Sequence, residues 1–180
     1  RAILKGTGEL EGESLESVQY EGYGPGGVAL LMETLTDNRN RTVADIRHLL
    51  SRYGGSLGES GCVAWMFERK GFIIINKQGL DEDELIMAAL EAGAEDVELE
   101  GDSYEVVTAP EKMEPVKSYL QETGMELTSS EVTMLPKSTI NITDPEEVER
   151  ILNLMEALEE HDDIQNVYAN FDIPEELMAG

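Results

Sequence analysis

Cysteine, histidine and long apolar runs are scarce or absent in this chain of 180 residues. The single cysteine, Cys62, excludes an internal disulfide, and a reducing compartment is the simplest inference. His48 and His161 lie far apart, so the chain has no zinc-ligand spacing. No apolar run approaches the roughly 20 residues that a membrane helix needs. We therefore expect no metal site, no cofactor and no membrane partner.

Basic residues are also few, since 13 lysines and arginines face 38 acidic residues and give a net charge of −25. Such a surface repels nucleic acid and anionic lipid unless its basic residues are concentrated locally. Hydrophobic residues make up 41% of the chain and charged residues 28%, which is typical of a soluble globular protein. The first six residues, RAILKG, lack the layout of a signal peptide, and we expect a cytoplasmic protein.

The segment Tyr20–Thr42 is the best-marked part of the chain and predicts a β-hairpin. Its strands, Val18–Tyr23 and Val28–Thr36, flank the turn sequence Gly24-Pro25-Gly26-Gly27. Proline restricts φ at the second position of a type II turn, and glycine supplies the positive φ at the third. A phosphate-binding loop is the alternative. The missing GxxxxGK[ST] pattern and the strand on either side favour the turn.

A helix should follow the hairpin. Thr42 is a suitable N-cap with Asp45 three residues later, and Gly54-Gly55 marks the end of the helix. Ser56–Gly61 then has the composition of a loop, and Cys62–Glu68 is expected to form a buried strand.

Residues 71–135 repeat a complete pattern of strands and helices. The order is βαββαβ, which is the ferredoxin-like plan. The first helix is capped by Asp81, and the second is expected to begin with a capping box of Thr108 and Glu111. The four predicted strands are Phe72–Asn76, Asp96–Leu99, Tyr104–Thr108 and Met125–Leu135.

The remaining part of the chain has too few helices to cover a sheet alone. It contains a strand at Thr139–Ile142, a helix that starts at Asp144-Pro145, and a strand at Ile164–Phe171. Pairing 16–70 with 136–174 gives a discontinuous α/β domain into which 71–135 is inserted. The predicted fold class is therefore α+β, with two ferredoxin-like α/β sandwich domains. Two sequential domains are the alternative. Residues 1–15 should be a linker from a missing N-terminal domain, and 175–180 a tail.

No arrangement of residues predicts catalysis. Nucleophilic chemistry would have to use Cys62 with His48, but Cys62 opens an apolar strand without an activating environment. Asp37-Asn38-Arg39-Asn40 has an arginine where a calcium loop needs its second ligand. The acidic pair Asp162-Asp163 is assigned to a helix end. We expect no enzyme, with no catalytic, cofactor-binding or metal-binding residues.

The distribution of arginine is more informative, because four of the seven arginines lie between positions 39 and 52. Asp45 is the only acid in that interval. Arginine suits phosphate, and asparagine can add hydrogen bonds to a backbone or base. The alternative is that these arginines form exposed ion pairs with surface acids, worth about 0–1 kcal/mol each. The predicted nucleic-acid-binding residues are Arg39, Arg41, Arg47, Arg52, Asn38 and Asn40.

Four stretches together resemble the signature of the YebC family. They are YEGYGPGG at 20–27, TDNRNRTVA at 36–44, GGSLG at 54–58 with VAWMF at 63–67, and AALEAGAEDV at 88–97. The resemblance extends over essentially the whole chain. It implies a three-domain protein with a basic N-terminal helical bundle, which this chain lacks, and two α/β domains, the third inserted within the second.

The resemblance also implies a function. The family is described as transcriptional regulators that bind DNA, and its members are bacterial cytoplasmic proteins with mitochondrial relatives. Those relatives resemble translational activators of cytochrome c oxidase subunit I, and bacterial members have been proposed to act on ribosomes stalled at proline-rich stretches. We therefore expect a DNA-binding regulator that acts without catalysis, together with the missing bundle. The alternatives are a translation factor that binds ribosomal RNA or the ribosome, and an acidic module that binds a basic protein.

Overall fold

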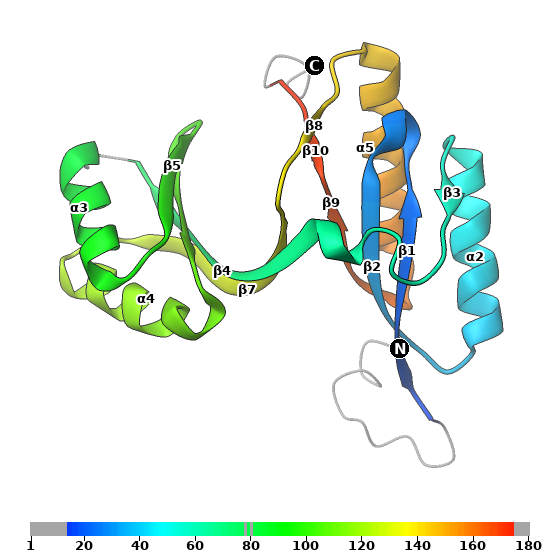
Figure 1. Ribbon diagram of the computed structural model, residues 1–180, viewed down its shortest axis with the longest axis horizontal. Coiled ribbons are helices and arrows are strands. Elements are labelled where there is room, and N and C mark those ends of the chain that lie inside the picture. Colours follow the sequence, from blue (N-terminus) through cyan, green and yellow to red (C-terminus); the bar gives the residue numbers. More distant parts are fainter. Residues whose placement is uncertain (1–13, 78, 80, 175–180) are drawn as a thin grey trace. The chain divides into compact units, whose positions relative to one another are not determined.

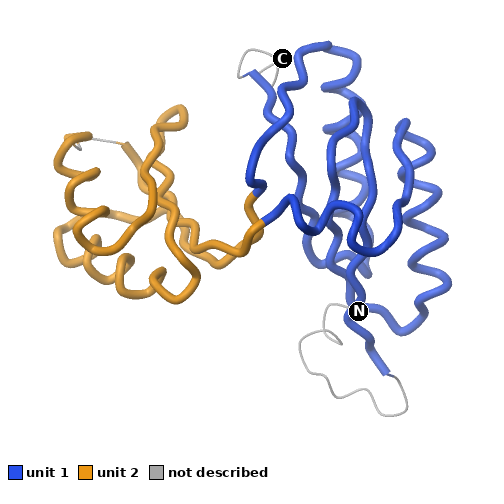
Figure 2. The backbone as a smooth tube through the Cα atoms, in the orientation of Figure 1, with its two compact units in different colours: residues 1–67, 136–180 blue, residues 68–135 orange. Residues whose placement is uncertain are grey.

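The computed structural model describes residues 14–77, 79 and 81–174 (Figure 1). The chain folds into two compact units (Figure 2). Unit 1 comprises residues 1–67 and 136–180, and unit 2 comprises residues 68–135. Each unit combines helices with a four-stranded sheet, which confirms the predicted α+β class with two domains. Most of the predicted linker, 1–15, and the whole predicted tail, 175–180, lie outside the described residues.

The sheet of unit 1 draws its strands from both halves of the unit. Its order is β3-β1-β2-β9, and β2 is paired with β1 on one side and β9 on the other. Leu31 lies opposite Glu21 of β1 and Tyr168 of β9, so residues 137 positions apart share one ladder. A second, parallel pair joins β8 to β10. The strands are β1 Glu16–Tyr23, β2 Ala29–Thr36, β3 Ser56–Leu57, β8 Ile140–Asn141, β9 Ile164–Ala169 and β10 Phe171–Asp172.

The turn between β1 and β2 has the predicted type II geometry. The Gly27 N–H donates to the Gly24 carbonyl at 3.2 Å, and Gly26 has φ 75° and ψ 9°. A Cβ on Gly26 would approach Ile142 to 3.0 Å, so the position favours glycine through both backbone conformation and space. The predicted hairpin is confirmed.

Two helices, α2 (Arg39–Arg52) and α5 (Pro145–Glu160), cover one face of this sheet (Figure 1). The α5 helix begins as predicted, because the Asp144 side chain accepts a hydrogen bond from the Glu146 N–H and Pro145 occupies the first turn. Alternate residues of β2 meet apolar residues of both helices. The buried core residues are Val28, Leu30, Met32, Ile46, Leu50, Ile142, Val148, Ile151, Leu154, Leu158, Ile164 and Ile173.

On the opposite face of the sheet, the segment before β4 (Phe67–Asn76) contacts β1 at Glu21, and here the prediction of a strand at Cys62–Glu68 is wrong. Residues 64–66 form a short 3-10 helix, η2 (Ala64–Met66), and β4 begins only at Phe67. The backbone N–H groups of this segment turn inward to the buried carboxylate of Glu21, so they cannot join a ladder. The Glu21 side chain, 40 positions before Gly61, therefore prevents this segment from forming the strand that its composition favours.

Unit 2 has the predicted βαββαβ order with the sheet arranged β5-β6-β4-β7. Its core residues come from the sheet and from the two helices: Ile73, Ile75, Leu85, Ala89, Tyr104, Val106, Val116 and Leu120. After β4 the elements are α3 Glu82–Ala92, β5 Asp96–Glu100, β6 Ser103–Thr108, η3 Pro110–Lys112, α4 Met113–Glu122 and β7 Leu127–Pro136. The predicted cap of α3 is confirmed, since the Asp81 carboxylate accepts from the Asp83 N–H at 3.1 Å.

The predicted capping box of Thr108 and Glu111 is wrong. The Thr108 hydroxyl donates to the Ala109 carbonyl at 2.7 Å instead of capping a helix. Pro110 starts the 3-10 turn η3, so α4 begins later, at Met113, with no side-chain cap. The β4 strand also begins five residues before the predicted start at Phe72.

Candidate nucleic-acid interface

The predicted basic segment forms the first turn of α2. Asn38 is the N-cap, and its side-chain oxygen accepts from the Arg41 N–H at 3.1 Å. The prediction that Thr42 caps this helix is therefore wrong, because Thr42 lies inside the helix and is fully buried. Arg39 and Asn40, which were expected in a loop, occupy the first helical turn.

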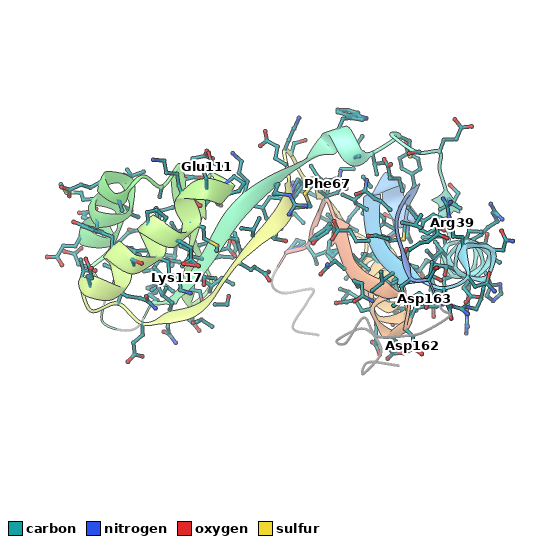
Figure 3. All side chains as sticks on the ribbon, turned by 90° about the horizontal axis from the view of Figure 1, so that it is seen from below. Arg39, Phe67, Glu111, Lys117, Asp162 and Asp163 are labelled. Carbon is teal, nitrogen blue, oxygen red and sulfur yellow. The ribbon has the colours of Figure 1, made fainter. Side chains whose placement is uncertain are left out.

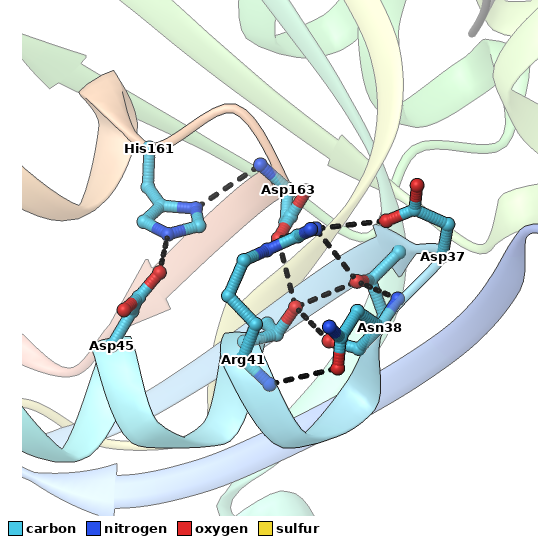
Figure 4. Close-up of polar contacts among 8 residues, drawn as sticks. Asp37, Asn38, Arg41, Asp45, His161 and Asp163 are labelled. Carbon is cyan, nitrogen blue, oxygen red and sulfur yellow. Dashed lines mark hydrogen bonds and ion pairs between the residues drawn. The ribbon is translucent and has the colours of Figure 1, made fainter.

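The Arg41 guanidinium is held by acids of its own chain (Figure 4). Its Nη2 lies 2.9 Å from Asp163 Oδ2, 2.9 Å from Asp37 Oδ1 and 3.3 Å from Thr36 Oγ1. Hydrogen bonds to the carboxylates of Asp163 and then Asp37 raise the pKa of Arg41 above its ordinary value. Arg41 consequently stabilises the start of α2 and does not present a free cation.

Asp163 connects the two halves of unit 1 at this point. Its side chain is only 2% exposed, and its Oδ2 lies 2.8 Å from the Thr42 hydroxyl as well as accepting from Arg41. Its backbone carbonyl accepts from the Leu35 N–H at 2.8 Å. The end of β2, the start of α2 and the entry to β9 are thus joined through one residue.

His161 extends these contacts along α2. Its Nδ1 accepts from the Asp163 N–H at 3.1 Å, so the ring hydrogen belongs on Nε2, which lies 2.8 Å from Asp45 Oδ2. Sequence reasoning missed both His161 and Asp163. The only local signal was the acidic pair at 162–163, and nothing in the sequence connects it with an arginine 122 residues earlier.

The surface beside these contacts is acidic. A hollow of about 440 Å³ is lined by one arginine, one histidine and four carboxylates. The lining residues are Arg41, Asp45, Glu160, His161, Asp162 and Asp163. Because carboxylates outnumber the single guanidinium, a phosphate would meet net repulsion in this hollow.

The three other arginines of the predicted site occupy different sides of α2. Arg39, at the surface of the first turn (Figure 3), lies 3.7 Å from Glu16. The Arg52 guanidinium lies 5.5 Å from the ring centre of Tyr53. Arg47 is exposed and makes no ion pair with the described residues. At 3.6 residues per turn, positions 47 and 52 are separated by roughly 140° around the helix. The structure therefore brings together Asn38 and Arg41, but it does not gather all four arginines into one patch.

The described residues give little support for a metal site, a reactive cysteine or a membrane helix. Among the described residues, no group of three or more histidine, cysteine, aspartate or glutamate side chains could hold a metal ion. Cys62 is half-buried, and its hydrogen bond to Tyr23 raises the pKa of that phenol. Within the described ranges, no helix combines the length and apolar character needed to cross a membrane.

The chain is similar to known proteins along almost its whole length. Residues 15–171 match the family description "TACO1/YebC second and third domain". A "Probable transcriptional regulatory protein" of Dictyoglomus thermophilum is 54% identical over 179 residues, which cover 99% of this chain and 72% of the relative. A protein of the same description from Halothermothrix orenii is 54% identical over 180 residues, which cover 99% and 71%.

A solved structure agrees with these matches. The crystal structure of a conserved hypothetical protein from Aquifex aeolicus superposes with a TM-score of 0.80 at 48% identity. The match covers 97% of this chain and 72% of that one. The chain belongs to the TACO1/YebC family.

Proposed function

We propose that this chain is part of a regulator of gene expression that acts by binding DNA, without catalysis. The observation that carries the proposal is the 54% identity to proteins named "Probable transcriptional regulatory protein" over 99% of the chain. Regulators of transcription act at nucleic acid, and phosphate contacts supply most of the affinity in such complexes.

The exposed arginines of α2 are the proposed phosphate contacts. Arg47 and Arg52 are exposed, and the ion pair that Arg39 forms with the described residues, to Glu16, is long, exposed and worth about 0–1 kcal/mol. Asn40 can add a hydrogen bond from the first turn. Asn38 and Arg41 act in this proposal by holding the start of α2 in place, because their polar groups already have intramolecular partners.

The test is duplex DNA binding by the double variant Arg47→Glu/Arg52→Glu, measured over a range of salt concentrations. Each lost phosphate contact lowers the slope of log K against log salt by about 0.9, so we expect a reduction of about 1.8. The matched control is Arg69→Glu/Arg150→Glu, which changes the net charge equally at positions outside α2. Equal losses in both variants would mean that only overall charge matters, and the proposed contacts would be wrong.

A second candidate is a translation factor that binds the ribosome through an acidic surface. The observation in its favour is the charge of unit 2, where residues 68–135 contain 17 acidic and five basic residues. Such a surface attracts basic proteins and repels duplex DNA. Co-sedimentation with ribosomes and pausing at defined codons in a deletion strain would favour this candidate over DNA binding.

A further inference from the structure

Trp65, the only tryptophan of the chain, is 63% exposed in η2 of unit 1. Large aromatic side chains are usually covered in folded domains. The indole N–H donates to the Cys62 carbonyl at 3.0 Å, which satisfies the polar edge of the ring within the loop. What remains for a ligand is therefore the flat π-surface of the ring.

The loop that carries Trp65 is held by Glu21. Glu21 Oε2 accepts from the Gly61 N–H at 2.6 Å, and Oε1 accepts from Val63 at 2.9 Å and Ala64 at 2.7 Å. Glu21 is 3% exposed. The Glu21 carbonyl also accepts from the Gly58 N–H at 2.8 Å. Four hydrogen bonds accepted by Glu21 thus fix the backbone on both sides of Cys62, in the loop that carries Trp65.

The backbone of an exposed lysine is hydrogen-bonded to η2. The Lys137 N–H donates to the carbonyl of Met66, the residue after Trp65, at 2.9 Å. Among the described residues of unit 1, Ile140 is the only other large hydrophobic side chain that is exposed, at 37%. Protein interfaces generally bury a cluster of apolar residues around such an anchor. A lone aromatic ring beside a lysine better fits a nucleobase with its phosphate.

We propose that Trp65 is a stacking platform for an unpaired nucleobase of single-stranded nucleic acid, with Lys137 as the neighbouring phosphate contact. The proposal rests on the proposed function only in taking nucleic acid as the partner, and it adds a different site. Glu21 and its loop lie on the face of the unit 1 sheet that α2 and α5 leave uncovered. Stacking tolerates any base, so we expect little sequence preference.

The first experiment uses the fluorescence of Trp65, which reports on this site alone because the chain has no other tryptophan. Short single-stranded oligothymidylate and oligouridylate are titrated into the protein, and a duplex of equal length serves for comparison. We expect saturable quenching by the single strands and none by the duplex. Absence of quenching by single strands, or equal quenching by duplex, would overturn the proposal. Quenching by a basic protein but not by oligonucleotides would instead identify a protein-docking site.

The second experiment measures binding of a labelled single strand to three variants. Trp65→Ala should weaken binding by roughly 5- to 150-fold, the range for loss of one base–aromatic stack. Trp65→Phe should retain most of the affinity. Glu21→Gln keeps Trp65 in the sequence but weakens the hydrogen bonds that hold its loop, so we expect an intermediate loss of affinity. The fluorescence of Trp65 shows whether this variant is folded. Equal binding by Trp65→Ala and the wild type would contradict the assignment.

The variant Arg47→Glu/Arg52→Glu separates this site from the proposed function. It should leave the quenching by single strands unchanged while weakening duplex binding. Quenching with unaffected duplex binding in this variant would refute the α2 contacts alone. A wild-type protein that binds duplex but shows no quenching by single strands would refute the Trp65 site alone. Loss of quenching in this double variant would mean that the two sites are not independent, which contradicts the inference.

Discussion

Glu21 in unit 1 and Glu105 in unit 2 occupy comparable places, since each lies on a central part of a sheet and on the face away from its helices. Glu21 is buried and receives three backbone hydrogen bonds. Burial alone would raise its pKa, but these donors lower the pKa below its ordinary value of 4.5. No backbone N–H of the described residues lowers the pKa of Glu105: burial, followed by the charges of Glu100 and Glu98, raises it.

The difference between the two glutamates comes from the chain around each one. In unit 1 a loop supplies N–H groups at hydrogen-bonding distance, so a buried charge is stabilised. In unit 2 the residue directly opposite Glu105 in the β5–β6 ladder is Glu98, another acid. At neutral pH the ionised Glu21 carboxylate therefore stabilises unit 1, whereas the ionised Glu105 carboxylate destabilises unit 2.

The largest effect should come from Glu21→Ala. One buried and two part-buried N–H groups would lose their acceptor, at up to about 1–3 kcal/mol each, so we expect the free energy of unfolding to fall by about 3 kcal/mol. Chemical denaturation measures this, and Glu16→Ala on the same strand is the exposed control, with an expected change within about 1 kcal/mol. A loss no larger than that of the control would mean that Glu21 does not hold the loop.

The stabilisation that Glu21 contributes should depend on pH in one direction. Because the folded-state pKa is lowered, the stabilisation by Glu21 is complete above pH 4.5 and is lost as the pH falls through the lowered pKa. The difference in unfolding free energy between the wild type and Glu21→Gln should therefore shrink on acidification. A difference that stays constant down to low pH would contradict the lowered pKa.

Asp163→Asn tests a second buried carboxylate of unit 1, whose donors are side chains. Arg41 and Thr42 contact the same oxygen, Oδ2, so the amide oxygen can take its place, but the negative charge beside the Arg41 guanidinium is lost. Because hydrogen bonds to charged groups are stronger than neutral ones, we expect a loss of about 1–3 kcal/mol. Asp162→Asn is the matched control at the exposed neighbouring position, with an expected change of about 0.5 kcal/mol or less. Similar effects for the two variants would show that the Arg41 contacts do not stabilise unit 1.

The smallest effect, and one of opposite sign, is expected for Glu105→Gln. Removing one of two facing acids should stabilise unit 2 by less than about 1 kcal/mol at neutral pH. Because the pKa of Glu105 is raised in the folded state, this advantage should diminish as the pH falls through that raised pKa and should be absent below the ordinary value of 4.5. Thermal denaturation at two pH values, with exposed Glu126→Gln as control, measures it. If Glu105→Gln destabilised unit 2 at neutral pH, Glu105 would be stabilising like Glu21, and the proposed difference between the two glutamates would be wrong.

Local signals in the sequence predicted most of the elements correctly. Pro25 and Gly26 specify their turn within four residues, and Asp81 and Asp144 each cap a helix through a neighbouring N–H. Such interactions need no knowledge of the rest of the fold. The hairpin, the α3 and α5 helices and the βαββαβ order were therefore predictable.

The errors have non-local causes. Threonine is a common N-cap residue, but the Thr42 hydroxyl lies near Thr36 and Asp163 inside the fold. The residue that caps the helix is Asn38. Residues 62–68 have strand propensity, but Glu21 draws their N–H groups away from a ladder. The arginine cluster was visible in the sequence, whereas the acids that hold Arg41 were not. The phosphate contacts proposed for α2 stay a prediction.

The pairing of β2 with β9 has a consequence for how the chain folds. Unit 1 is incomplete until residues 164–169 have been synthesised, whereas every strand of unit 2 is contained in a much shorter stretch. Once β4 and β7 are neighbours in the sheet, the ends of the 68-residue insertion lie side by side. The loop that β2 and β9 must close is then about halved, which lowers its entropic cost by about 0.6 kcal/mol. An inserted unit that folds first thus lowers the entropic cost of pairing β9 with β2.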